Sequence, residues 1–466
     1  MTTPTAPPSV RAQALELVRR YGWNATSFQT LEEGYRYFFH AEGLVAYVDT
    51  GRAWVAAGAP IAPVDQIKQV LSEFLRAAEE QGRRACLFAT EERLLELSGD
   101  SLRSLRIGEQ PVWDPRAWEQ ILKRRRSLRE QLRRARAKGV LVREVTAAEL
   151  DAGGTRAGIA RVAERWLKTR NLAPMEFLVR LELFSFSQER RCFVAEQGGK
   201  IVGVAGVVPV PARSGWFIED LVRDPTAPNG TGELLIDGVM RWASQRDCGW
   251  VTLGLAPLAG DVSPLLRAAR RSGAVLYDFE GLRSYKAKLE PEHWMPIFLS
   301  YPPTQGAVRS LLDALWAFTR TGFWGFAWRT LTRGPIVVIR ALALLLIPWT
   351  LLLALAPAEH WFPWPWLKWS WVVFDVVVAA GLFRLLYKRG TASLTPLAVA
   401  VTFDAVSTPL QAVLWNLPRA RAFSDYAIIA LGCAAPLLAS VVLWGARNFR
   451  LSSDENGPSS GLISRS

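Results

Sequence analysis

The chain has 466 residues, which is enough for two or three domains with cores of their own. Its net charge of +13 favours anionic partners, either phospholipid head groups or nucleic acid. Four cysteines without a CxxC pair and only three histidines give little support to a zinc site or a Ser-His-Asp triad. We therefore expect neither a metal nor a cofactor. Residues 1–10 lack the apolar core of a signal peptide, which predicts a cytoplasmic soluble part.

The first 139 residues have the pattern of an α/β domain. Residues 11–20 have helical spacing, and three short apolar runs between 35 and 57 predict antiparallel strands joined by tight turns. A helix is expected over 66–81, followed by strands at 85–89 and 105–113. We assign residues 11–139 to an N-terminal domain.

A strongly basic helix is expected over residues 118–138, with Gly139 as its natural C-cap. Its charge lies all round the helix, so it is expected to bind the phosphates of tRNA or of anionic lipid, in a salt-sensitive manner. A merely solvated helix is the alternative. The candidate phosphate-binding residues are Lys123, Arg124, Arg125, Arg126, Arg129, Arg133 and Arg134.

The α/β pattern then restarts and predicts a second domain over residues 140–300. The expected strands are 140–145, 191–196, 201–209, 217–223 and 250–255, and the expected helices are 157–170, 233–245 and 265–272. Two successive α/β units are the simplest interpretation of this order.

Asp220 and Arg223 stand at the end of the predicted strand 217–223 and are the candidate catalytic residues. A carboxylate can accept a proton, and a guanidinium can bind phosphate or developing negative charge. In a regular strand Glu219 points away from Asp220, and Arg223 does so too. Joint action of Asp220 and Arg223 therefore requires the strand to end or bulge between them. A structural ion pair is the alternative.

Four apolar runs follow, over residues 335–356, 369–387, 395–415 and 426–444, each long enough to cross a hydrocarbon core of about 30 Å. Residues 301–334, rich in Trp, Phe and Arg, suit an interfacial amphipathic linker. An even number of spans and the basic residues beside them predict a multi-pass protein of the inner (plasma) membrane with cytoplasmic soluble domains. The membrane part is assigned to 335–445 and a disordered tail to 446–466.

Several ordered landmarks carry a family resemblance. They are Glu164-Arg-Trp-Leu-Lys, Asp220-Leu-Val-Arg, Leu253-Gly-Leu-Ala-Pro-Leu and Phe279-Glu-Gly-Leu-Arg-Ser-Tyr-Lys. On these, the chain resembles the catalytic region of the bacterial lysylphosphatidylglycerol synthetases, also called multiple peptide resistance factors. The resemblance implies an α/β fold of tandem GNAT-like (acyl-CoA N-acyltransferase-type) domains, followed here by an α-helical membrane domain. It also implies transfer of an aminoacyl group from aminoacyl-tRNA to the hydroxyl of a membrane lipid, usually phosphatidylglycerol.

Two further groups become candidate substrate-binding residues in this light. Asn229, Gly230 and Gly232 form a turn that presents backbone N–H groups where ordinary GNAT enzymes hold coenzyme A pyrophosphate. Pro225 and Pro228 interrupt that turn and remove donors, which argues against acetyl-CoA; a bare turn is the alternative.

The second group is Arg283, Tyr285 and Lys286, expected near the tRNA acceptor end or else on a β-strand with solvent-facing lysines. Two other functions stay open for the whole chain. One is a GNAT-like acyltransferase with an acyl thioester donor, and the other is a non-catalytic membrane module that binds anionic lipid or RNA.

Overall fold

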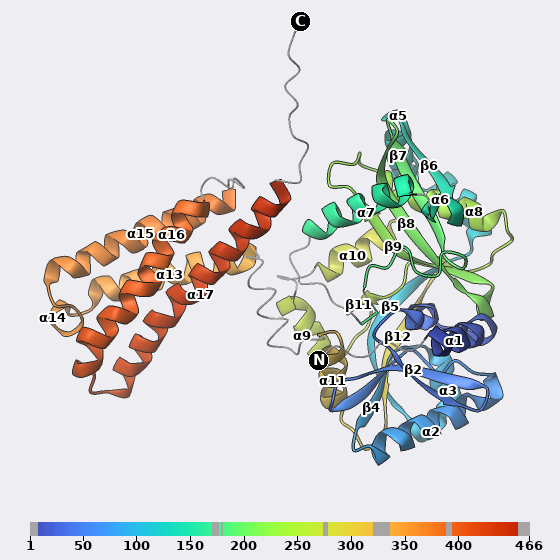
Figure 1. The fold of residues 1–466 in the computed structure, drawn as a ribbon, viewed down its shortest axis with the longest axis horizontal. Coiled ribbons are helices and arrows are strands. Elements are labelled where there is room, and N and C mark those ends of the chain that lie inside the picture. Colours follow the sequence, from blue (N-terminus) through green and yellow to red (C-terminus); the bar gives the residue numbers. More distant parts are fainter. Residues whose placement is uncertain are drawn as a thin grey trace, which may run out of the picture. The chain divides into compact units, whose positions relative to one another are not determined.

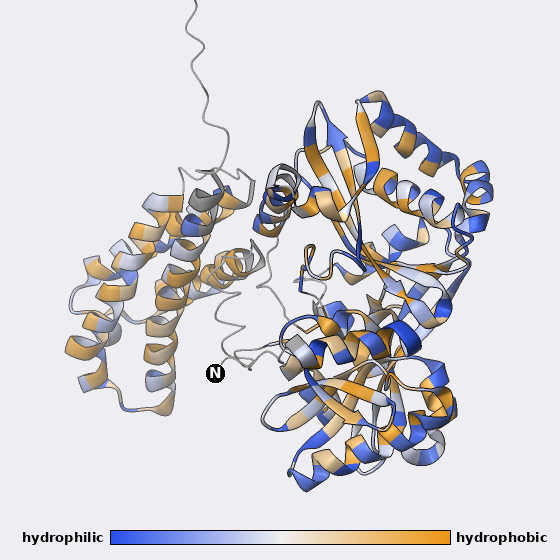
Figure 2. Ribbon diagram, turned by 45° about the vertical axis from the view of Figure 1, so that its right-hand side comes forward, coloured by the Kyte–Doolittle hydropathy of each residue, from blue (hydrophilic) through white to orange (hydrophobic). Residues whose placement is uncertain are grey.

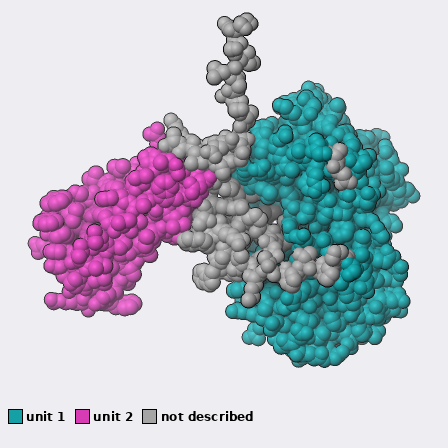
Figure 3. Space-filling view, viewed as in Figure 1, with its two compact units in different colours: residues 1–169, 174–322 teal, residues 170–173, 323–466 magenta. Residues whose placement is uncertain are grey.

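The structure is a computed structural model that describes residues 8–151, 153–169, 177–178, 180–273, 278–319, 336–387 and 394–454. The chain divides into two compact units (Figure 3). The first comprises residues 1–169 and 174–322, and the second comprises residues 170–173 and 323–466. Apolar residues cover the helices of the second unit, whereas polar and apolar residues alternate over the first (Figure 2).

The first unit is built on a twelve-stranded sheet with the order β1-β2-β3-β4-β12-β5-β10-β9-β8-β7-β6, and β11 pairs with β5 (Figure 1). The N-terminal half contributes β1 (Arg36–His40), β2 (Gly43–Asp49), β3 (Ala53–Ala57), β4 (Arg84–Thr90) and β5 (Arg103–Trp113). The C-terminal half contributes β6 (Val140–Val145), β7 (Arg191–Gln197), β8 (Lys200–Val210), β9 (Gly215–Arg223), β10 (Val251–Thr252), β11 (Ala256–Pro257) and β12 (His293–Tyr301).

The two halves repeat one connection. In each half an antiparallel meander, β1–β3 or β6–β9, leads through a helix into a strand parallel to the last strand of the meander. The helices are α2 (Ile67–Glu80) and α8 (Thr231–Ser244), and the parallel pairs are β3 with β4 and β9 with β10. This repeat within a mixed sheet confirms the expected tandem GNAT-like α/β fold.

The last strand of each half lies beside the other half. Strand β5 pairs with β10, and β12 runs between β4 and β5. Strand β12 therefore closes the N-terminal part of the sheet, although its residues come at the end of the second expected domain. The regions 11–139 and 140–300 are halves of a single body.

Helices cover both faces of the sheet. In the N-terminal half, α2 and α3 (Glu92–Ser98) pack on one face, while α1 (Pro8–Tyr21) and α11 (Ala307–Ala317) pack on the other. In the C-terminal half, α4 (Trp118–Arg124), α5 (Arg126–Ala137) and α8 cover one face, and α6 (Ala147–Asp151) and α7 (Gly153–Lys168) cover the other. Helices α9 (Pro264–Gly273) and α10 (Phe279–Ala287) connect β11 to β12.

Three local expectations differ from the structure. The basic helix expected over 118–138 is two helices, because the backbone turns at Arg125, where φ is −96° and ψ is 89°. The segment after Phe279 forms helix α10, so a strand with solvent-facing lysines is wrong. The strand expected over 250–255 is in the sheet only at Val251–Thr252, because the chain leaves β9 after two residue pairs.

The second unit contains α13 (Ile336–Leu355), α14 (Ala358–Trp361), α15 (Pro365–Tyr387), α16 (Leu394–Gln411) and α17 (Phe423–Asp454). Among the described residues, three stretches are long and apolar enough to cross a membrane: Pro365–Leu385, Leu394–Arg419 and Phe423–Asn448. The first expected span holds a shorter apolar run, Leu342–Leu355. Helix α17 continues past the expected end of the membrane part, and residues 455–466 and 320–335 lie outside the described ones.

Candidate functional site

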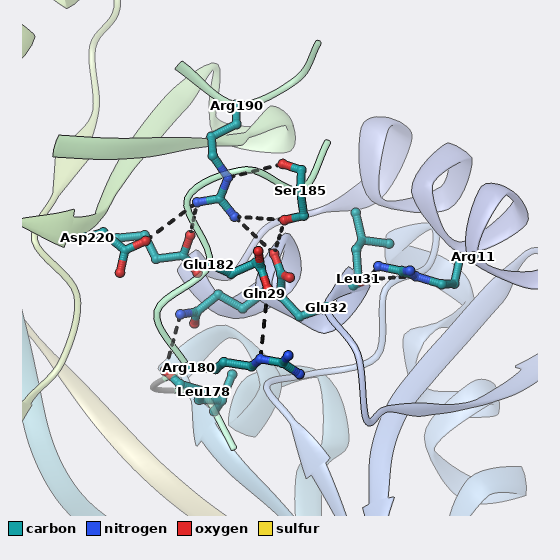
Figure 4. A network of polar contacts seen from close by, with 11 residues as sticks. Arg11, Gln29, Leu31, Glu32, Leu178, Arg180, Glu182, Ser185, Arg190 and Asp220 are labelled. Atoms are coloured by element: carbon teal, nitrogen blue, oxygen red, sulfur yellow. Dashed lines mark hydrogen bonds and ion pairs between the residues drawn. The ribbon is translucent and has the colours of Figure 1, made fainter. Parts of the chain in front are cut away.

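Arg190 precedes β7, and its side chain is 0% exposed. Its guanidinium group lies 2.9 Å from Glu32, 2.5 Å from Glu219 and 3.8 Å from Asp220 (Figure 4). The hydroxyl group of Ser185 donates a 2.8 Å hydrogen bond to Glu32. We call these five residues the Arg190 cluster. Because Glu32 follows a 3-10 turn of the N-terminal half, the cluster joins the two halves of the first unit.

A β-bulge in β9 brings two carboxylates to the same cation. The register of β9 against β8 shifts at this point. As a result, Ile218 packs in the core beside α8 while Val222 packs in the core beside α7, although a regular strand would place both on one face. The strand is therefore not regular at this point, and the expected separation of Glu219 from Asp220 does not apply, since both side chains reach Arg190.

Asp220 is 9% exposed, and its Oδ2 has no hydrogen-bond partner among the described residues. Burial first, and then the charge of Glu219, raise the pKa of Asp220 well above its usual range, although Arg190 opposes this. Burial also raises the pKa of Glu32 to about 7. Gly206 leaves room for the site, because a Cβ there would lie 3.3 Å from Oδ2 of Asp220. A buried carboxyl group with a raised pKa is suited to proton transfer near neutral pH.

The side chain of Arg223 does not lie on the same face of β9 as the side chain of Asp220. The register of β9 is regular from Asp220 to Arg223, so the two side chains leave opposite faces of the strand. Arg223 is exposed and makes no ion pair or hydrogen bond with the part of the chain that the structure describes. Its charge acts on Tyr285 instead: burial, and then the charge of Glu233, raise the pKa of that phenol, and Arg223 opposes the rise.

The turn at Asn229–Gly232 opens α8 and is closed on one side by α5. Gly230 has a φ of +92°, and a Cβ there would lie 2.3 Å from the carbonyl oxygen of Gln131. A Cβ at Gly232 would lie 3.3 Å from the hydroxyl of Tyr285, while the side chain of Asn229 is exposed. At Gly230 the backbone therefore contacts a helix, which leaves no space for a side chain at this position.

Two of the predicted substrate-binding cations make internal contacts. The ammonium group of Lys286 is buried and donates to the carbonyls of residues 253–255 at 2.8 to 3.0 Å. Burial lowers the pKa of Lys286 to about 7. Arg283 donates to Glu109 at 2.8 Å and lies over the ring of Trp294. Both residues hold α10 against the sheet, which leaves their binding role a prediction.

All seven predicted phosphate-binding residues are exposed. Four of them, Lys123, Arg126, Arg129 and Arg133, line a pocket of about 500 Å³ between α4, α5 and α8. Arg133 and Arg134 are held by Glu130. In contrast, Lys123 and Arg126 make no ion pair within the described ranges. We call this the basic pocket; its charged lining is Glu119, Lys123, Arg126, Arg129, Glu130, Arg133, Arg136 and Arg241. Six cations against two carboxylates favour a ligand that carries phosphate groups.

Sequence reasoning missed Arg190, Glu32 and Ser185. Arg190 and Glu32 are 158 positions apart, and neither stands in a motif, so only the fold brings them together. Within the described ranges, no group of three or more His, Cys, Asp or Glu residues could hold a metal ion.

The chain is similar in sequence to known proteins. The model of a family described as phosphatidylglycerol lysyltransferase, C-terminal, matches residues 15–301. A phosphatidylglycerol lysyltransferase of Bacillus subtilis (strain 168) is 26% identical over 318 residues, which are 64% of this chain and 35% of that protein. The lysylphosphatidylglycerol biosynthesis bifunctional protein LysX of Nocardia farcinica is 26% identical over 262 residues, which are 53% of this chain and 23% of that protein. This chain thus spans about a third or less of these two relatives.

Two solved structures share the fold. The C-terminal domain of a putative lysylphosphatidylglycerol synthetase from Agrobacterium fabrum has a TM-score of 0.57 and 24% identity, and covers 67% of this chain and 99% of its own. The structure of L-PGS from Bacillus licheniformis has a TM-score of 0.59 and 22% identity, and covers 69% of this chain and 99% of its own.

Proposed function

Because the chain belongs to the phosphatidylglycerol lysyltransferase C-terminal family, we propose that it transfers an aminoacyl group from aminoacyl-tRNA to the hydroxyl group of a phosphatidylglycerol-type membrane lipid. We place the reaction at the cytoplasmic face of the plasma membrane, with the apolar helices of the second unit as a multi-pass anchor.

The reaction is an ester exchange. The lipid hydroxyl oxygen attacks the ester carbonyl carbon of the aminoacyl group, and the bond from that carbon to the tRNA ribose oxygen breaks. The proton of the lipid hydroxyl passes to the carboxylate of Asp220 and then to the departing ribose oxygen. The exchange balances without a redox step, so its requirements are a base, charge stabilisation and alignment of the two substrates.

The observation that carries the proposal is the environment of Asp220. Its Oδ2 has no hydrogen-bond partner among the described residues, and its raised pKa makes it a stronger base than an exposed aspartate. The neighbouring Arg190 orients the carboxyl group without a close hydrogen bond, at 3.8 Å. A substrate hydroxyl that reaches Oδ2 would therefore meet a buried carboxyl oxygen that makes no competing hydrogen bond with the described residues.

The charge of the Arg190 cluster supports an aminoacyl donor. Three carboxyl groups surround one guanidinium group, so the site holds more potential negative than positive charge. An aminoacyl group brings an ammonium ion, which would stabilise the ionised carboxylates in this buried place. We assign this ammonium ion to Glu32 and Glu219. The phosphates of the tRNA are assigned to the basic pocket and to the exposed Arg223.

The structure offers less support for an acyl thioester donor. Pro225 and Pro228 remove backbone N–H donors from the turn that would hold a coenzyme pyrophosphate. A non-catalytic binding module would not depend on the protonation of Asp220, and this difference can be measured.

The test is mass spectrometry of lipids extracted from cells that express the protein, the Asp220→Asn variant or the Asp100→Asn control. Asp100 is an exposed aspartate on the same unit. We expect a lipid heavier by one aminoacyl residue in the wild type and the control, reduced by roughly 10²- to 10⁴-fold in Asp220→Asn. An unchanged product in Asp220→Asn would overturn the role of this residue. No new lipid from well-expressed wild-type protein would overturn the proposed reaction.

A further inference from the structure

One face of helix α11 packs against the sheet of the first unit and forms hydrogen bonds with it. Asp313 of α11 accepts two hydrogen bonds from Arg84 of β4, at 2.6 and 2.7 Å. Ala314 and Ala317 are buried in the core between α11 and the sheet. The thiol of Cys86 donates a 3.8 Å hydrogen bond to the backbone carbonyl of Ser310. This inner face fixes the rotation of α11 about its own axis, so its outer face is a constant part of the surface.

That outer face is apolar. Val308, Leu312 and Leu315 are 56%, 59% and 52% exposed, and their spacing of four and three residues places them in one stripe. Arg309 beside the stripe is exposed, and at the end of the helix Arg52 lies 5.1 Å from the ring centroid of Trp316. We call these three apolar residues the α11 stripe. An apolar row bordered by arginines and a tryptophan matches a helix that lies in the interface of an anionic bilayer.

We propose that the α11 stripe is a membrane-docking surface, which rests the N-terminal half of the first unit on the anionic lipid bilayer. The covalent chain supports this choice of occupant. About 18 residues separate the end of α11 at Ala317 from the start of α13 at Ile336, and such a segment spans at most about 60 Å when extended. The same chain carries helices long enough to cross a membrane, so the bilayer is within reach of α11.

Charge complementarity points the same way. Arg309 and Arg52 are exposed cations beside the stripe, and basic residues near an anionic surface are attracted to it. Docking would cover the side chains of Val308, Leu312 and Leu315, which water otherwise contacts. The proposal depends on membrane association alone and not on the transfer reaction, so either can fail without the other.

Helix α2 supplies a matched control. It covers the opposite face of β3 and β4: Trp54 and Leu87 pack towards α2, whereas Val55 and Cys86 pack towards α11. Docking through α11 therefore leaves the outer face of α2 in water, and Glu79 is exposed there.

The experiment uses the full chain, reconstituted in bilayers that contain anionic lipid. An environment-sensitive fluorophore is attached to Leu312→Cys or, as the control, to Glu79→Cys. Cys433→Ala removes the one native thiol that is not buried. We expect emission from position 312 to shift to the blue and to be quenched at least twofold more by nitroxide on lipid head groups than by aqueous iodide. Position 79 should show the reverse.

Equal and weak head-group quenching at positions 312 and 79 would overturn the proposal. Protection of position 312 from iodide without head-group quenching would also overturn it, because the stripe would then be covered by protein. Bilayers of neutral lipid provide the second arm. Weaker head-group quenching at position 312 in neutral bilayers is the expected result, and equal quenching would remove the assigned role of Arg309 and Arg52.

Discussion

Glu32 of the N-terminal half and Arg190 of the C-terminal half form a 2.9 Å ion pair in the interior of the first unit. Arg190 also lies within ion-pair distance of Glu219 and Asp220, so one guanidinium group compensates the negative charge of carboxylates from both halves. Removing a single partner of such a buried group leaves the others without compensation, which is costly. The cluster therefore links the proposed chemistry to the assembly of the two halves.

The first prediction concerns pH. Burial raises the pKa of Glu32 from its ordinary value of about 4.5 to about 7, so the stability contribution of this group is complete below the ordinary value and is lost as pH rises through about 7. The free energy of unfolding of the wild type should fall by roughly 3 kcal/mol across this window relative to Glu32→Gln. Thermal unfolding at a series of pH values checks this, and parallel curves for the two proteins would contradict it.

The same titration should affect the proposed transfer reaction. If the ionised Glu32 receives the amino group, the rate rises as pH passes about 7 in the wild type. Glu32→Gln should be slower and should lack this inflection. Initial rates of lipid product formation in isolated membranes measure the effect.

The second prediction concerns the contact between α8 and α5. Gly230→Ala adds a methyl group 2.3 Å from the carbonyl oxygen of Gln131 and places alanine at a φ of +92°. Gly34→Ala is the matched control, because Gly34 has a φ of +103° and no atom near its Cβ position. The control should cost about 1 kcal/mol, and Gly230→Ala at least about 2 kcal/mol more. Equal losses in chemical unfolding would show that α5 moves freely away from the turn.

The third prediction concerns Lys286. Lys286→Met leaves three backbone carbonyls, those of residues 253–255, without their donor, so we expect a loss of at least about 2 kcal/mol. Lys288→Met is the control on the same connection, since Lys288 is exposed. The measurement is the midpoint of thermal unfolding at pH 8. A midpoint as high as that of the control would contradict the structural role.

Lys286 also makes a pH-dependent contribution of its own. Burial lowers its pKa from 10.5 to about 7, so the contribution of this group is complete above the ordinary value and is lost as pH falls through about 7. Wild-type stability should therefore rise with pH above about 7 relative to Lys286→Met, in the direction opposite to the effect of Glu32.

The fourth prediction concerns the basic pocket. Lys123 and Arg126 line it without an ion pair among the described residues, so their charges are available to phosphate. Combined Lys123→Ala and Arg126→Ala should weaken tRNA binding and reduce the slope of log affinity against log salt by about 2. Lys68→Ala with Arg103→Ala, two exposed cations elsewhere on the first unit, is the control. Equal slopes for both double variants would contradict RNA binding at the pocket.

The element pattern of the first unit was largely predictable, because strands such as β3 and β9 have local apolar runs bounded by turn residues. The position of β12 was not. Its residues His293–Tyr301 are apolar and aromatic, which also suits an interface helix, and only pairing with β4 and β5 distinguishes the two. Long-range pairing of this kind leaves no local signal.

Of the five residues of the Arg190 cluster, the sequence predicted one, Asp220, as a catalytic residue. Asp220 was identified from its strand end and from family resemblance, but its partner was expected to be Arg223. A one-residue bulge changes which side chains share a face, and residues 217–222 of β9 contain no glycine or proline that would predict it. Arg190 and Glu32 depend on the packing of two halves and could not be found locally.

Strand β12 comes from the C-terminal half but pairs with β4 and β5 of the N-terminal half. This pairing has a consequence for the synthesis of the protein. While the ribosome makes the first 292 residues, β4 and β5 have no strand between them, and their edges stay open. The N-terminal half therefore cannot finish folding as it emerges, and both halves close together once Tyr301 has been added. During this interval the nascent chain presents open strand edges, which favour aggregation. A gene fragment that encodes either half alone would make such edges permanent.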